Sequence, residues 1–334
     1  MKHEIDLNKY NIRTDLILES IENNNNKIDT ITENHDGILV TSVNVDDKSS
    51  SLLNKEKGKY TTILFEDATD STNASKIEEV LISVLKEYIG NKNNILVIGL
   101  GNAKSTPDSL GPQTIEKLII TRHLFLLGEE VSSGIREVSS FCPGVMADTG
   151  IETSNYIKAL TMEIKPELVI VIDALAAGSI ERVNKSIQIT DTGIHPGSGV
   201  GNMRKEISLE TIGIPVVAVG VPTVVEASVI VYDTINYLFK HISYLKDNQD
   251  KNKLIFTRNN YLNKIKDRDL SPKEKKDVLG VIGELSDTEQ KNLINEVLTS
   301  VNYNFIVTPK EIDFVIDKLS TIIGNGINKC LHDI

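Results

Sequence analysis

Two aspartates occupy positions at which a repeating strand and helix pattern exposes reactive groups. Asp108 lies in the loop after the apolar run 95–98, and Asp173 directly follows the apolar run 168–172. Both runs are short and unbroken, which is typical of strands buried on both faces of a parallel sheet. Because such sheets carry their chemistry in loops at the carboxyl ends of the strands, we expect both carboxyl groups at one edge of the sheet.

Two carboxyl groups in one crevice can perform acid–base chemistry without a metal or a cofactor. Like charges held close together cannot both ionise cheaply, so one group keeps its proton while the other loses it. The ionised group can take a proton from water, and the protonated group can polarise a carbonyl. Each aspartate could instead be a helix cap or a turn residue, which is a common use of Asp after a strand.

A glycine-rich loop at residues 193–202 could hold an anion or an extended peptide. Its backbone N–H groups can form an anion-binding nest, or can donate to a substrate strand or a developing oxyanion. We therefore expect substrate or oxyanion support from His195, Gly197, Ser198 and Gly199. A role for His195 as a base or metal ligand is less favoured, because no second histidine lies at ligand spacing.

Other motif matches do not support common enzyme classes. The loop 99–104 has two glycines but lacks the third glycine of a dinucleotide-binding fingerprint, and the sequence has no P-loop motif. The Asp-Thr-Gly triplets at 148–150 and 191–193 resemble those of pepsin-like proteases. An isoleucine follows each triplet, however, and the surroundings alternate strand and helix, so turn chemistry explains both.

The composition indicates a folded globular protein that does not bind nucleic acid. The 334 residues are 40% hydrophobic and 25% charged. A net charge of -11 repels phosphate backbones and anionic lipid, and with 5% aromatic residues and no Trp there is little for bases to stack on. Two widely separated cysteines suit a reducing cytosol, and the charged N-terminus does not resemble a secretory signal. The apolar stretch 213–232 contains two prolines and a glutamate, so we expect no membrane span.

The hydrophobic pattern predicts an α/β fold with a mostly parallel sheet and helices on both faces. Residues 1–36 are polar and should be loosely held, and the runs 37–45 and 60–65 predict a hairpin or edge pair. Further strands are predicted near 95–98, 136–141, 168–172, 186–190 and 215–221, and helices near 77–88, 108–124, 152–164 and 224–239. We expect an α/β core at 16–242 and a helical C-terminal region, 243–334, packed on it.

Ten segments of the chain resemble the germination protease family of endospore-forming bacteria. They are residues 10–16, 99–102, 106–112, 121–124, 143–146, 149–153, 172–177, 179–184, 191–202 and 220–225. The resemblance covers residues 1 to about 240 and is weaker in the C-terminal third. The sequence departs from the expected family pattern at Asp148 and at Gly178, where we expect a larger residue in relatives.

The resemblance implies an atypical aspartic endopeptidase whose catalytic aspartates fall on Asp108 and Asp173. It implies a fold similar to that of hydrogenase-maturation proteases, a homotetramer, and no metal or other cofactor. It also implies a zymogen whose propeptide, residues 1–15, is removed by self-cleavage of the Asp15–Leu16 bond. The expected substrates are small acid-soluble spore proteins, degraded during germination in the cytoplasm of the forespore or spore core.

Two other function classes fit the same residues. A metal-dependent hydrolase could use Asp108, Asp173 and His195 as ligands. A non-enzymatic binding module could hold a phosphate or nucleotide in the loop 193–201. Chelator sensitivity would favour the first alternative, and a nucleotide-dependent rise in melting temperature would favour the second.

Overall fold

A computed structural model of the chain describes residues 14–23, 28–200, 204–247, 265, 267–300 and 305–333. The described residues form two compact units, a larger one within Arg13–Val225 and Val307–Ile334 and a smaller one within Glu226–Ile306. Residues 1–13 of the predicted propeptide lie outside the described residues. Both candidate aspartates belong to the larger unit.

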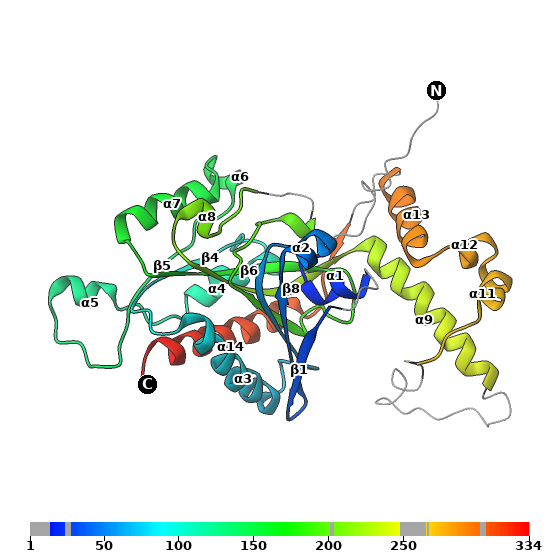
Figure 1. Cartoon of the computed structure of the whole chain (residues 1–334), viewed down its shortest axis with the longest axis horizontal. Coiled ribbons are helices and arrows are strands. Elements are labelled where there is room, and N and C mark those ends of the chain that lie inside the picture. The colour runs from blue at the N-terminus through cyan, green and yellow to red at the C-terminus, as the bar shows by residue number, and fades with distance from the viewer. Residues whose placement is uncertain are drawn as a thin grey trace. The chain divides into compact units, whose positions relative to one another are not determined.

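The larger unit is built on one mixed sheet (Figure 1). Its strands run in the order β1 (Thr30–His35), β2 (Ile38–Val45), β3 (Gly58–Leu64), β7 (Ser186–Thr190), β8 (Val216–Glu226), β6 (Leu168–Ala177), β4 (Asn94–Gly99) and β5 (Glu137–Phe141). Strands β8, β6, β4 and β5 are parallel to one another. Strands β1, β2, β3 and β7 extend the sheet with antiparallel pairings.

Helices cover both faces of this sheet, which confirms the predicted α/β class (Figure 1). One face packs against α3 (Ser71–Ile89), α4 (Leu110–Ile115) and α14 (Ile312–Leu331). The other face packs against α7 (Thr153–Ile164) and α8 (Leu209–Ile212), and α1 (Ile17–Asn23) packs with α2 (Asp47–Leu53) on β2 and β3. Shorter elements lie in loops: η2 (Thr106–Asp108), α5 (Arg122–Leu127), α6 (Met146–Thr149) and η3 (Ser198–Val200).

The sequence pattern explains why the core forms. In β6 the four residues Val169 to Ile172 are fully buried, since helices lie on both faces of the strand. In α3 the buried residues Ile77, Leu81 and Leu85 recur every fourth position and form one apolar stripe. Burying each such side chain contributes roughly 1.5–3 kcal/mol, so the stripe holds the helix on the sheet.

The predicted single helix at 108–124 is wrong. The chain forms η2 and α4, leaves helical structure after Ile115, and resumes as α5 at Arg122. Thr121 explains the break, because its backbone N–H donates to Val138 O at 3.1 Å and its hydroxyl donates to Arg136 O at 2.6 Å. These bonds to the β5 segment replace helical ones.

Three other strands differ from the prediction in extent. Asp173 lies inside β6 rather than after it, because β6 continues to Ala177 by pairing with β8. β8 likewise runs through Pro222 to Glu226, with a register shift in its partner between Leu175 and Ala176. β1 forms within the segment predicted to be loosely held, and all six of its residues are exposed.

The smaller unit contains α9 (Ala227–Asp247), α11 (Pro272–Leu279), α12 (Val281–Glu284) and α13 (Asp287–Ser300). Lys246 of α9 forms an ion pair with Glu274 of α11 at 2.9 Å. The predicted boundary at residue 242 falls inside α9, and β9 (Ile306–Val307) lies where the two units meet in the sequence. In the parts of the chain that the structure describes, no helix has both the length and the apolar character to cross a membrane.

Candidate active site

Asp108 is fixed by a tight loop at the end of β4. Gly101 adopts φ +107, and a Cβ at this position would lie 2.0 Å from the carbonyl oxygen of Asp108. The backbone N–H of Asn102 donates to Asp108 Oδ2 at 2.9 Å and to its carbonyl oxygen at 3.0 Å. The hydroxyl of Thr223 donates to Pro107 O at 2.7 Å, which ties the loop to β8. Glycine is therefore required where the loop closes on Asp108.

Asp173 is buried in the neighbouring strand β6, with 6% of its surface exposed. Its Oδ1 accepts the N–H of Ala174 at 2.9 Å. Burial is the main cause that raises the pKa of Asp173 well above its usual value, and the charges of Asp108 and Asp15 raise the pKa further. The two predicted catalytic carboxyl groups therefore interact electrostatically.

Asp108 is less buried than Asp173. Burial raises the pKa of Asp108 above its ordinary value, and the hydrogen bond from the Asn102 N–H partly opposes this shift. Each acid accepts one backbone N–H, so the deeper burial of Asp173 and the charges of Asp108 and Asp15 distinguish the two. Of the two acids, Asp173 is thus better suited to retain a proton and Asp108 to be ionised.

A third acid, Asp15, lies at the same place. Its backbone N–H donates to Ala176 O at 3.2 Å, and the N–H of Ala176 donates to Asp15 Oδ2 at 3.0 Å. The hydroxyl of Ser198 donates to Asp15 Oδ1 at 2.6 Å. A Cβ on Gly199 would lie 2.2 Å from Asp15 Oδ2, so the glycine leaves room for this carboxylate. Ser198 and Gly199 of the predicted loop therefore cradle Asp15.

The other two predicted loop residues have less direct positions. Gly197 adopts φ +73, a left-handed conformation that suits glycine. The backbone carbonyl of His195 accepts the N–H of Ser198 at 3.2 Å, and this hydrogen bond does not involve the imidazole ring. Within the described ranges, no three His, Cys, Asp or Glu side chains are grouped so that they could hold a metal ion. Asp108, Asp173 and His195 thus do not form the alternative metal-ligand set.

Gln188 of β7 also contacts the segment around Asp15, and the sequence patterns did not single it out. Its Nε2 donates to the carbonyl oxygen of Asp15 at 3.1 Å, and its Oε1 accepts the N–H of Ile17 at 2.7 Å. Only 6% of its surface is exposed. A lone Gln within an otherwise Ser, Thr and Ile strand is the only signal that the sequence offered.

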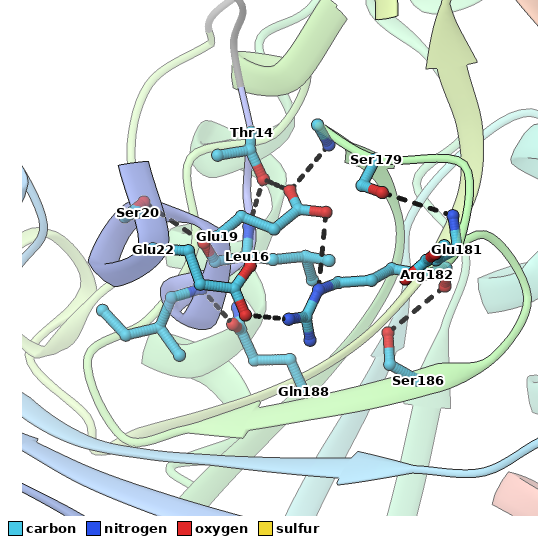
Figure 2. Close-up of polar contacts among 12 residues, drawn as sticks. Thr14, Leu16, Glu19, Ser20, Glu22, Ser179, Glu181, Arg182, Ser186 and Gln188 are labelled. Atoms are coloured by element: carbon cyan, nitrogen blue, oxygen red, sulfur yellow. Dashed lines mark hydrogen bonds and ion pairs between the residues drawn. The ribbon is translucent and has the colours of Figure 1, made fainter. Parts of the chain in front are cut away.

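Polar contacts also connect the start of α1 to the loop after β6 (Figure 2). The N–H of Leu16 donates to Thr14 Oγ1 at 3.0 Å, and that hydroxyl donates to Glu19 Oε2. The N–H of Gly178 donates to the same Glu19 oxygen at 2.6 Å. Arg182 lies on the other side, where its Nε is 3.8 Å from Glu19 Oε1.

Comparison with known proteins identifies the family. A family model described as germination protease matches residues 9–334, nearly the whole chain. The chain belongs to the germination protease family. The predicted resemblance is thereby confirmed, and it extends through the C-terminal third of the chain.

Curated members of the germination protease family match over almost their full length. The germination protease of Bacillus subtilis is 42% identical, with 99% of this chain and 96% of that protein covered. That of Oceanobacillus iheyensis is 45% identical, with 97% and 95% covered. That of Priestia megaterium is 41% identical, with 99% and 96% covered. The chain is therefore a protease of the germination type.

One solved structure is also similar to part of the chain. The [NiFe] hydrogenase maturation protease HycI from Thermococcus kodakarensis is 23% identical, with 42% of this chain and 80% of that chain covered and a TM-score of 0.28.

Proposed function

We propose that this germination protease is an aspartic endopeptidase made as a self-processing zymogen, and that it starts the degradation of small acid-soluble spore proteins. The observation that carries the proposal is the position of Asp15, which precedes the predicted cleavage bond. Its charge raises the pKa of Asp173, and it is hydrogen-bonded to Ala176 of the same strand and to Ser198. This arrangement supports a peptide bond bound beside the acid pair.

In the proposed mechanism, Asp108 is the base and Asp173 is the acid. Water gives a proton to the Asp108 carboxylate and attacks the carbonyl carbon of the scissile bond. Asp173, which burial and neighbouring charges keep protonated, donates to the carbonyl oxygen. Collapse of the tetrahedral intermediate returns a proton to the departing nitrogen, which becomes the amino group of the new chain end.

Gln188 supplies a further donor to the same carbonyl. Its Nε2 already donates to Asp15 O at 3.1 Å, which is the carbonyl oxygen of the bond to be cleaved. A fixed amide donor at a developing oxyanion can contribute about 2.7–4 kcal/mol. This proposal moves the oxyanion role from the loop 193–201 to β7, and leaves Ser198 and Gly199 to bind the side chain of the residue before the cleaved bond.

The zymogen is inactive in this proposal because Asp15 occupies groups that a substrate would use. While the pro-segment is attached, its last residue takes up the hydroxyl of Ser198, the N–H of Ala176 and one donor of Gln188. A protein substrate needs these same groups, so it cannot bind until residues 1–15 leave. A homotetramer and a location in the forespore or spore core remain part of the proposal and rest on the family resemblance.

The test is self-processing of the purified full chain at mildly acidic pH, followed by mass spectrometry. We expect a new N-terminus at Leu16, and the processed protein should cleave a small acid-soluble spore protein. Asp108→Asn and Asp173→Asn should each abolish both reactions, whereas Asp148→Asn, at an exposed position, should retain them. Normal processing in either of the first two variants would refute the acid pair.

A further inference from the structure

We infer that Glu19 is the binding site for the α-ammonium group that cleavage creates at Leu16. The inference rests on the proposed cleavage of the Asp15–Leu16 bond. It assigns a role to a buried carboxyl group that the proposed mechanism does not use. The ligand is the chain's own new terminus, a primary ammonium ion.

The new terminus is held in place after cleavage. Leu16 and Ile17 are 1% and 0% exposed, and Ile17 packs with Val43 and Tyr60 of the sheet. The N–H of Ile17 donates to Gln188 Oε1 at 2.7 Å. None of these contacts involves residues 1–15, so they survive removal of the pro-segment. The amino group of Leu16 is therefore created next to side chains that stay in place, where a cation benefits from a nearby carboxylate.

Thr14 holds the place of the ammonium group in the uncleaved chain (Figure 2). Its hydroxyl accepts the N–H of Leu16 at 3.0 Å and donates to Glu19 Oε2. A single hydroxyl thus separates the Leu16 nitrogen from the carboxylate. Thr14 leaves with the pro-segment, and Glu19 Oε2 then loses its hydroxyl donor at the moment the nitrogen gains its charge. A direct N⁺–H···O⁻ bond is stronger than the neutral bonds it replaces.

Glu19 is arranged to accept such a donor. It is 3% exposed, and the N–H of Gly178 orients it at 2.6 Å. Its Oε1 has no hydrogen-bond partner in the described chain, although Arg182 Nε lies 3.8 Å away. The guanidinium of Arg182 also donates to Glu22. Arg182 is thus shared between Glu22 and Glu19, and the unpartnered Oε1 leaves Glu19 able to accept a further donor.

The other charged groups near Glu19 are Arg182, Glu22 and Lys55, and the last of these also lies near Asp15. Burial raises the pKa of Glu19, and Arg182 lowers it. Lys55 Nζ donates to Thr14 O at 3.0 Å, and the charge of Asp15 supports its ionised form. Both of these partners of Lys55 leave with the pro-segment. Glu19 also supports the ionised form of Lys55 and remains after cleavage, so the new terminus at Leu16, directly before α1, becomes a further cation beside Glu19.

The pair would connect processing to the active site. Glu19 also bonds to Gly178, which directly follows β6, the strand that carries Asp173. An ammonium bound to Glu19 would stabilise α1 against the end of this strand after the pro-segment has gone. Processing would then empty the site of Asp15 without loosening the elements around it.

The experiment measures the Leu16 amino group in the self-processed full chain. Competitive labelling with trace acetic anhydride across pH, read by mass spectrometry of the N-terminal peptide, gives its pKa and reactivity. Free α-amino groups titrate at about 7.7–8.0, and we expect a value about one unit higher here, a tenfold gain in proton affinity. A value in or below the ordinary range would overturn the inference, and this measurement needs no variant.

Two matched variants locate the partner. In the processed Glu19→Gln protein, the reactive free-base fraction at pH 8, and with it the labelling rate, should be about four- to fivefold higher than in the wild type. Glu22→Gln, on the same helix and also next to Arg182, should label as the wild type does. Before cleavage, Glu19→Gln should melt near the wild-type temperature, because Thr14 can donate to an amide oxygen; after cleavage it should melt several degrees lower. An equal loss in both states would indicate a merely structural role for Glu19 and contradict the inference.

A second route to the same product separates this inference from the proposed function. A factor Xa site can be placed directly before Leu16 by three substitutions, Arg13→Glu, Thr14→Gly and Asp15→Arg, because Ile12 already supplies its first residue. Factor Xa then releases residues 16–334 without self-cleavage. If no Leu16 terminus ever forms in the unmodified chain, the proposed self-processing fails. If the Leu16 amino group of the factor Xa product then has an ordinary pKa that does not depend on Glu19, the inference fails as well. If its pKa is raised and depends on Glu19, the inference holds although the proposed self-processing has failed.

Discussion

Asp173 on β6 and Gln188 on β7 pair with the same residue of the strand between them, Gly220. Residues directly opposite one another in a sheet project to the same face, so both side chains emerge from one row. Their backbones are two strand spacings apart, or roughly 10 Å. An acid and an amide donor therefore lie on the same face of the sheet, on either side of Gly220, and the side chain of Leu175 lies over that glycine.

This row predicts a catalytic effect of Gln188. Gln188→Met keeps the size of the side chain and removes its donor, so in processed enzyme acting on an added peptide we expect kcat to fall about 100- to 1000-fold. KM should change little. Ser186→Ala, on the same strand and facing the same way, is the control. A rise in KM at unchanged kcat would mean that Gln188 contributes only to substrate binding.

The close contact between Gly101 and Asp108 predicts the effect of a side chain at position 101. A Cβ at Gly101 meets Asp108 O at 2.0 Å, whereas a Cβ at Gly37, with φ +96, meets nothing within 4 Å. Alanine at either position carries left-handed strain of about 1–2 kcal/mol. Only Gly101→Ala should also displace Asp108 and lower kcat, by about 100-fold. Equal activities of the two variants in a peptide-cleavage assay would contradict this account.

The raised pKa of Asp173 predicts how stability depends on pH. The unfolded aspartate ionises near pH 3.9, before the folded one does, so the free energy of unfolding falls as pH rises from there to the folded pKa. Asp173→Asn removes this loss. We expect the variant to melt above the wild type at pH 7 and to match it near pH 4. Each tenfold difference in proton affinity between the folded and unfolded states corresponds to about 1.4 kcal/mol, or about 2–4 °C in melting temperature. Calorimetry at the two pH values tests this, with Asp148→Asn as the control.

Ser198 predicts a preference for the residue before the cleaved bond. Its hydroxyl bonds to the Asp15 carboxylate at 2.6 Å, and a hydrogen bond to a charged group contributes about 1.5–3 kcal/mol. In processed Ser198→Ala enzyme, kcat/KM for a peptide cleaved after Asp should therefore fall roughly 10- to 100-fold. A matched peptide with Ala in place of Asp should be cleaved equally by both enzymes. If kcat/KM falls equally for both peptides, Ser198 does not recognise the Asp side chain.

The sequence was sufficient for the parts of the fold that depend on local pattern. Unbroken apolar runs predicted β4 and the first half of β6, and fourfold spacing predicted α3. The second half of β6 was not predicted, because Ala174, Ala176 and Ala177 have little strand preference and are extended only by pairing with β8. The break after Ile115 was also missed, since it is caused by distant partners of Thr121 rather than by Gly or Pro.

The grouping of the candidate site residues was predictable to a similar degree. The proximity of Asp108 and Asp173 follows from their positions near strand ends, and the glycine loop marked Ser198 and Gly199. Gln188 and Glu19 were not predicted, because their importance depends on a contact with residues 14–17 that no spacing in the sequence reveals. Single polar residues in apolar surroundings are too common for pattern alone to distinguish them.

β6 is longer than its neighbour β4, and this difference restricts what the enzyme can bind. The last residue of β6 that pairs with β4 is Ile172, yet β6 continues to Ala177, and Asp15 bonds to the backbone of Ala176 beyond that point. A chain that docks there must offer backbone groups not already used in its own helix or sheet. Natively folded proteins would thus be spared, and unstructured chains consumed.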